Sequence, residues 1–133
     1  MKLVFDTNVL ISAFVTRGHS YEVFEYCLRN HTIFASLEIL GEFEEKMAEK
    51  LGFKRKSVNE FSQYLKRNLI LSDSLAEIDE VCRDPKDNHI LALALGSHAD
   101  AILTGDADLL TLKKFHGIPI LTPSAFWTFQ KEH

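Results

Sequence analysis

The chain has 133 residues, of which 46% are hydrophobic and 26% charged, proportions typical of a soluble globular protein. This length predicts one domain over residues 1–133, burying roughly 68% of the surface that the unfolded chain exposes. The formal net charge of −4 argues against a large basic surface that coats nucleic acid nonspecifically. It does not exclude a nuclease, because acidic residues gathered around a cation also lower the net charge.

The sequence predicts a cytoplasmic protein with no membrane contact. No apolar run approaches the ~20 residues that a membrane span needs, and Asp6 interrupts the N-terminal apolar segment too early for a secretory signal. Cys27 and Cys82 are far apart and lack a CxxC spacing, so we expect buried thiols in a reducing compartment.

Predicted strands alternate with predicted helices along the chain. Strands are expected at 3–5, 32–35, 68–72, 101–104 and 118–121. Helices are expected from about 12, from 20 to 29, from 36 to 50, from 57 or 59, from 85 to 96, after 106 and from 123, with Ser20, Ser36 and Asp84 as N-caps. Alternation of this kind calls for right-handed crossovers and a mostly parallel sheet with helices on both faces.

The opening stretch contains the first candidate site residue. An uninterrupted apolar run at 3–5 is typical of a strand buried on both faces of a parallel sheet, and Asp6 follows it directly. Ligands of open α/β sheets bind at the carboxyl ends of the strands. A charge directly after a buried strand has few structural roles, so we predict that Asp6 is functional.

Four further acids could reach the same edge of the sheet. Asp106 and Asp108 follow the predicted strand at 101–104, Asp87 opens a helix, and Glu42 lies in the helix after the second strand. Each has a structural alternative. Asp87, near the third helical position, and Asp108 could compensate a helix dipole, Asp106 could be an N-cap, and Glu42 could belong to a solvated acidic face.

Convergence of these carboxylates predicts a bound cation. Two carboxylates about 4 Å apart repel by roughly 4 kcal/mol at an effective dielectric constant near 20, so several in one crevice protonate, separate or recruit a cation. Mg²⁺ or Mn²⁺ suits an all-oxygen site and supports displacement at phosphorus. No histidine or cysteine pair has a zinc-ligand spacing, and His89 is expected at the surface or behind a site residue.

Four motifs occur in a fixed order: FDTNVL at 5–10, Ser36 with Glu42, RDPKDN at 83–88 and TGDADLL at 104–110. Together they resemble the PIN-domain nucleases over essentially the whole chain, and most closely the small bacterial and archaeal toxins akin to VapC. The resemblance implies a three-layer α/β/α sandwich with a mostly parallel sheet of about five strands. It also implies an Mg²⁺- or Mn²⁺-dependent endoribonuclease, an RNA substrate, a cognate antitoxin protein and a homodimer.

The resemblance also assigns roles to individual residues. It makes Asp6, Glu42, Asp87 and Asp106 the catalytic acids. The implied metal ligands are Asp6, Asp87, Asp106 and Asp108, while Glu42 orients or deprotonates the attacking water or completes the outer shell of a metal ion. Asn8 and Thr104 match polar residues that help order the site. Asp84 matches a frequent acid, ranked below Asp87 because a cap role explains it.

Two basic stretches could bind RNA phosphates. The first runs from Lys46 to a predicted basic loop, and the second lies near the last strand. Their residues are Lys46, Lys50, Lys54, Arg55 and Lys56, and Lys113, Lys114 and His116. We expect Phe126, Trp127 and Phe129 to form core or dimer contacts.

Alternative functions remain open at this point. A haloacid-dehalogenase-type phosphatase also begins with a strand ending in aspartate, but it requires a second aspartate where Asn8 stands. A receiver-type phosphoacceptor domain matches poorly. A module that binds RNA or a partner without cutting is the third alternative.

Overall fold

A computed structural model describes residues 1–16, 18–73, 76 and 87–133. In this part of the chain the strands are β1 (Lys2–Phe5), β2 (Thr32–Ala35), β3 (Ile70–Leu71), β4 (Ala101–Leu103), β5 (Lys114–Phe115) and β6 (Ile118–Leu121). They form one sheet in the order β3-β2-β1-β4-β6-β5. Neighbouring strands run parallel except β5 and β6. The predicted mostly parallel sheet is therefore confirmed.

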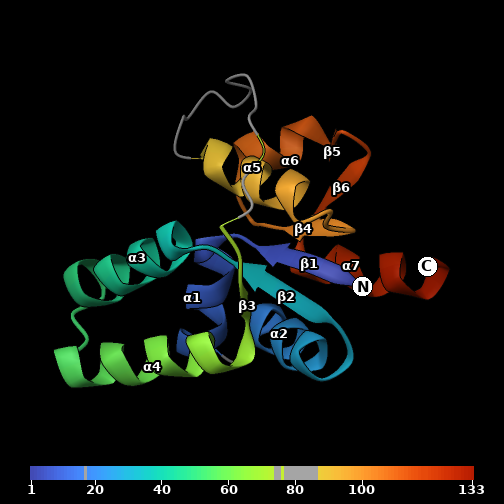
Figure 1. The fold of residues 1–133 in the computed structure, drawn as a ribbon. Coiled ribbons are helices and arrows are strands. Elements are labelled where there is room, and N and C mark those ends of the chain that lie inside the picture. The colour runs from blue at the N-terminus through green and yellow to red at the C-terminus, as the bar shows by residue number, and fades with distance from the viewer. Residues whose placement is uncertain (17, 74–75, 77–86) are drawn as a thin grey trace.

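Helices cover both faces of the sheet, which confirms the three-layer sandwich. They are α1 (Thr7–Val15), α2 (His19–Asn30), α3 (Leu37–Glu45), α4 (Arg55–Asn68), α5 (Asn88–Gly96), α6 (Ala107–Leu112) and α7 (Pro123–Glu132), and a π-helical turn, η1 (Lys46–Lys50), continues α3. Figure 1 shows α1 to α4 on one side of the sheet and α5 and α6 on the other. No helix of the described residues has the length and apolar character needed to cross a bilayer.

The first strand forms the centre of the core. Leu3, Val4 and Phe5 are each 0% exposed, and β1 pairs in parallel with β2 on one side and β4 on the other. Burial on both faces explains why this strand has no polar residue between Leu3 and Phe5. The first polar side chain after it, Asp6, is thereby fixed at the carboxyl edge of the sheet.

Two predicted helix starts were wrong. The first helix begins at Thr7 rather than near residue 12, because the Asp6 carbonyl oxygen already accepts hydrogen bonds from the backbone N–H groups of Val9 and Leu10. The predicted basic loop at 54–56 is also wrong. Lys54 is the N-cap of α4, and the two residues after it form its first turn. Arginine and lysine are good helix formers, so the helix begins before the serine and asparagine that were predicted as caps.

Smaller differences concern α2, α5 and β5. The N-cap of α2 is Gly18, not Ser20. The α5 helix begins at Asn88, so Asp87 immediately precedes it instead of lying near its third position, while Asp84 and Cys82 lie outside the described residues. The two-residue strand β5 was not predicted, because an antiparallel pair this short has no periodic pattern to detect.

Other local predictions are confirmed. The Ser36 hydroxyl accepts a hydrogen bond from the Ile39 N–H at 3.1 Å and caps α3, and helical structure continues to Lys50. Cys27 is fully buried, and burial raises the pKa of its thiol to about 12. Phe126 is 0% exposed, in the core.

Candidate active site

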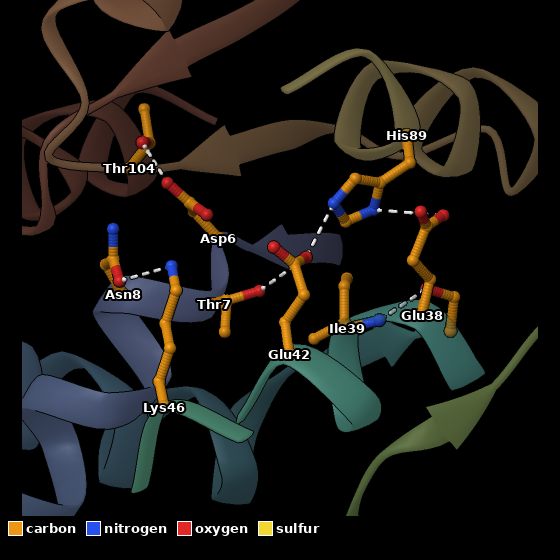
Figure 2. Close-up of polar contacts among 10 residues, drawn as sticks. Asp6, Thr7, Asn8, Glu38, Ile39, Glu42, Lys46, His89 and Thr104 are labelled. Atoms are coloured by element: carbon orange, nitrogen blue, oxygen red, sulfur yellow. Dashed lines mark hydrogen bonds and ion pairs between the residues drawn. The ribbon is translucent and has the colours of Figure 1, made fainter. Parts of the chain in front are cut away.

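The site is built where the two central strands end. The Asp6 N–H, directly after β1, donates to the Leu103 carbonyl at the end of β4 at 2.9 Å. The Thr104 hydroxyl donates to Asp6 Oδ2 at 2.8 Å (Figure 2). The prediction that Asp6 shares an edge of the sheet with the segment after the fourth strand is confirmed.

The Asp6 carboxylate is buried but does not cap its helix. Asp6 is 6% exposed and occupies the N-cap position of α1, yet its side chain accepts no capping hydrogen bond. The Thr104 hydroxyl and the N-terminal end of the α1 dipole both favour a negative charge here. The carboxylate is thus held at the sheet edge without serving the helix.

Asp106 is the N-cap of α6, the structural alternative for this residue. Its Oδ1 accepts hydrogen bonds from the backbone N–H groups of Asp108 at 2.8 Å and Leu109 at 3.1 Å. Its own N–H donates to the Thr104 hydroxyl at 2.9 Å. Capping and metal binding are compatible, since the cap uses one carboxylate oxygen and fixes the orientation of the other.

A three-carboxylate group lies beside Asp6. Asp87, Asp106 and Asp108 each offer a carboxylate oxygen, and the three atoms all lie within 4.8 Å of one another. All three side chains are partly buried, so their repulsion is screened less than at an open surface. An all-oxygen, all-anionic donor set fits a hard divalent cation such as Mg²⁺ or Mn²⁺. Asp6 is not a member of the group, and is connected to Asp106 through Thr104.

Glu42 is held by contacts from two other elements. Its Oε1 accepts a hydrogen bond from the Thr7 hydroxyl at 3.3 Å and lies 2.6 Å from His89 Nε2 (Figure 2). The side chains of Glu42 and His89 are 27% and 12% exposed, so neither belongs to a freely solvated face. Of the two expectations for His89, a position behind a site residue is the one observed.

Asn8 and Lys46 meet next to Glu42. The Lys46 ammonium donates to Asn8 Oδ1 at 3.2 Å, and lies one helical turn after Glu42 (Figure 2). A cavity of about 490 Å³ opens here, lined by Glu38, Glu42, Glu45, Lys46, Glu49, Lys50 and His89.

The sequence did not predict the contacts of Thr7 and His89 with Glu42, or that of Lys46 with Asn8. No local spacing signals the contact between Lys46 and Asn8, which are 38 positions apart. Only the tertiary structure brings Thr7 and His89 to Glu42. The residues Lys54, Arg55 and Lys56 lie at the start of α4, at the end of the α3–α4 pair that points away from α5 and α6 (Figure 1).

Fold and site together define an α/β/α sandwich protein with an acidic centre at the carboxyl edge of its sheet. The family model for the PIN domain matches residues 2–108, and the chain belongs to the PIN domain family.

Solved structures of similar fold include the following two. One is a chain of VapBC2 from Rickettsia felis bound to a DNA fragment from their promoter, at 17% identity and a TM-score of 0.65, covering 90% of this chain and 97% of that one. The other belongs to FitAcB from Neisseria gonorrhoeae, at 16% identity and a TM-score of 0.56, covering 92% and 98%. At these identities the likeness concerns the fold. A comparison with curated protein sequences found no match.

The Thr104 hydroxyl connects Asp6 to Asp106, so its removal should be costly. We expect Thr104→Val to lower the free energy of unfolding by about 1–3 kcal/mol, because the buried Asp6 carboxylate loses its donor. Thr104→Ser keeps the hydroxyl and should lose less, although it leaves a small cavity. Urea unfolding measures both, and an equal loss in the two variants would show that the hydroxyl contributes nothing.

Proposed function

We propose that the protein is a metal-dependent endoribonuclease that hydrolyses RNA phosphodiester bonds and acts as the toxin of a toxin–antitoxin pair. The observation that carries this proposal is the group of Asp87, Asp106 and Asp108 within 4.8 Å, beside Asp6, in a chain of the PIN domain family. Membership of that family supports nuclease activity. The preference for RNA rests on the resemblance to VapC toxins.

Asp87, Asp106 and Asp108 would hold Mg²⁺ or Mn²⁺. Asp6, which is connected to Asp106 through Thr104, would be a further ligand. When bound, such an ion supplies a Lewis acid for the phosphate and lowers the pKa of water. The bound cation would stabilise the three partly buried carboxylates, because it offsets their mutual repulsion.

The chain's own residues orient the reactants. Glu42 orients the attacking water and accepts its proton, while Thr7 and His89 fix its Oε1. Lys46 and Asn8 lie next to Glu42, where an ammonium and an amide can bind a substrate phosphate. Attack of water on phosphorus breaks the bond to the 3′ oxygen, so the products carry a 5′-phosphate and a 3′-hydroxyl.

Further phosphates of a long RNA would contact Lys54, Arg55 and Lys56. These cations lie at the end of the α3–α4 pair away from α5 and α6, so a short RNA held at the acids would not reach them (Figure 1). In this arrangement Lys46 contacts the RNA near the cleaved bond, and the basic start of α4 contacts the RNA farther from it.

A protein partner belongs to the same proposal. The structural neighbours VapBC2 and FitAcB support an antitoxin as partner. We propose that it blocks the acidic site. We also propose that the protein acts as a homodimer in the cytoplasm, where its RNA substrate is found.

Cleavage should depend on Asp6 and on the metal. We expect purified protein to shorten labelled RNA with Mn²⁺ or Mg²⁺ and to stop with chelator. Asp6→Asn should reduce cleavage to background without loss of fold, because Asn keeps an acceptor for Thr104 but lacks the charge. The matched control is Asp100→Asn, which should cleave normally, because Asp100 precedes β4 and accepts a hydrogen bond from the Lys2 N–H at the opposite end of the strands.

The same assay separates the alternatives. A phosphatase would release phosphate from small esters and leave RNA intact, and a binding module would shift RNA in a gel without shortening it. Full activity of a cleanly purified Asp6→Asn protein, or activity that survives chelator, would overturn the proposed mechanism.

The two groups of cations should differ in the RNA length they require. In the Asp6→Asn background with chelator, we expect Lys46→Ala to weaken binding of both short and long RNA. Alanine at 54, 55 and 56 should weaken only long RNA and reduce the salt slope by about 0.7 for each phosphate that the protein no longer neutralises. Fluorescence anisotropy at several salt concentrations measures both. Lys131→Ala, at the end of α7, is the control, and unchanged binding in both variants would remove these cations from the binding surface.

Toxicity should require the same carboxylate as cleavage. We expect induced expression of the wild-type protein to arrest growth of a bacterial host. The Asp100→Asn protein should also arrest growth, whereas the Asp6→Asn protein should not. Growth arrest by Asp6→Asn would show that toxicity does not come from hydrolysis. Growth curves with matched expression levels decide between these outcomes.

A further inference from the structure

We propose that His89 is a positioning residue that holds the Glu42 carboxylate in place and thereby sets the rate of cleavage. This inference rests on the proposed function and goes beyond it, since it assigns a role to a residue outside the acidic motif. Its basis is the contact between His89 Nε2 and Glu42 Oε1 at 2.6 Å.

The contact is short, sheltered and supported from a third element. His89 is 12% exposed, so water competes little for its Nε2. A donor facing a carboxylate at this distance forms a charge-assisted hydrogen bond. The Thr7 hydroxyl donates to the same oxygen from α1, so Glu42 Oε1 is fixed from α1 and α5 while its backbone belongs to α3 (Figure 2).

Without His89, Glu42 would lose its stronger anchor. A glutamate side chain has considerable rotamer freedom, and Lys46 lies four residues later on the same helical face as a competing partner. A carboxylate that turns toward Lys46 no longer faces Thr7. Misplacement of a reacting group by about 1 Å can cost a hundredfold in rate.

The hydrogen bond also connects two acids of the site. His89 follows Asp87 by two residues at the start of α5, while Glu42 lies on α3. The same contact therefore fixes the start of α5, which Asp87 immediately precedes, relative to the helix that carries Glu42. The other imidazole nitrogen contributes less, because Nδ1 lies 3.6 Å from Oε2 of the well-exposed Glu38 and makes no hydrogen bond in the described part of the chain.

The kinetic test compares His89→Leu with His89→Gln. Leucine keeps apolar volume without a donor, and we expect kcat for RNA to fall about 10- to 100-fold, as when other supporting partners of site residues are removed, with KM changed less than about twofold. The glutamine amide nitrogen reaches the position of Nε2 and should restore most of kcat. His133→Leu, at the end of α7, is the matched control and should behave as wild type.

A double-mutant cycle tests whether the effect acts through Glu42. On a Glu42→Gln background, His89→Leu should change kcat little further. Additive losses in the cycle, a failure of glutamine to rescue, or a rise in KM with kcat unchanged would each overturn the proposal.

A structural readout works without RNA or metal. In crystals of the His89→Leu protein we expect the Glu42 carboxylate to have left Thr7, whereas in wild-type and His89→Gln crystals it stays. If wild-type protein cleaves no RNA, the proposed function fails, and the crystals still decide whether His89 holds Glu42. A Glu42 carboxylate that stays beside Thr7 in His89→Leu would overturn the inference.

Discussion

The hydrogen bond from Thr104 to Asp6 is the contact on which the site depends. It joins the ends of the two central strands, and the same hydroxyl accepts the N–H of Asp106. Burial makes it strong, since Asp6 is 6% and Thr104 0% exposed. One threonine therefore fixes the relative positions of an acid from the first six residues and an acid from beyond residue 100.

The acids around this threonine fall into two groups with different physical support. Asp87, Asp106 and Asp108 repel one another within 4.8 Å, an arrangement that a divalent cation would stabilise. Glu42 is held by side chains of two other elements, Thr7 and His89. This division agrees with the proposed mechanism, in which the first group binds a metal ion and Glu42 accepts a proton from the attacking water.

Charge is unevenly distributed around the site, although the chain is acidic overall. Lys46 donates a hydrogen bond to the amide oxygen of Asn8 and lines a cavity that four glutamates also line. Lys46 and Lys50 are the lysines of this lining, and we propose that they are the groups a phosphate would contact there. The π-helical turn that begins with this lysine lies at the same place, as such turns often do at functional sites.

The sequence alone determined the parallel sheet, the buried first strand and the candidate acids, because apolar runs, helix caps and ordered motifs are local signals. It misplaced the starts of α1 and α4, where helix propensity competes with cap preference, and missed β5, which is too short for a pattern. Only the tertiary structure decided that Asp6 is connected to Asp106 through Thr104 and that His89 contacts Glu42. Such distances depend on how α3 and α5 pack across the sheet edge, and packing between residues 47 positions apart leaves no trace in local periodicity.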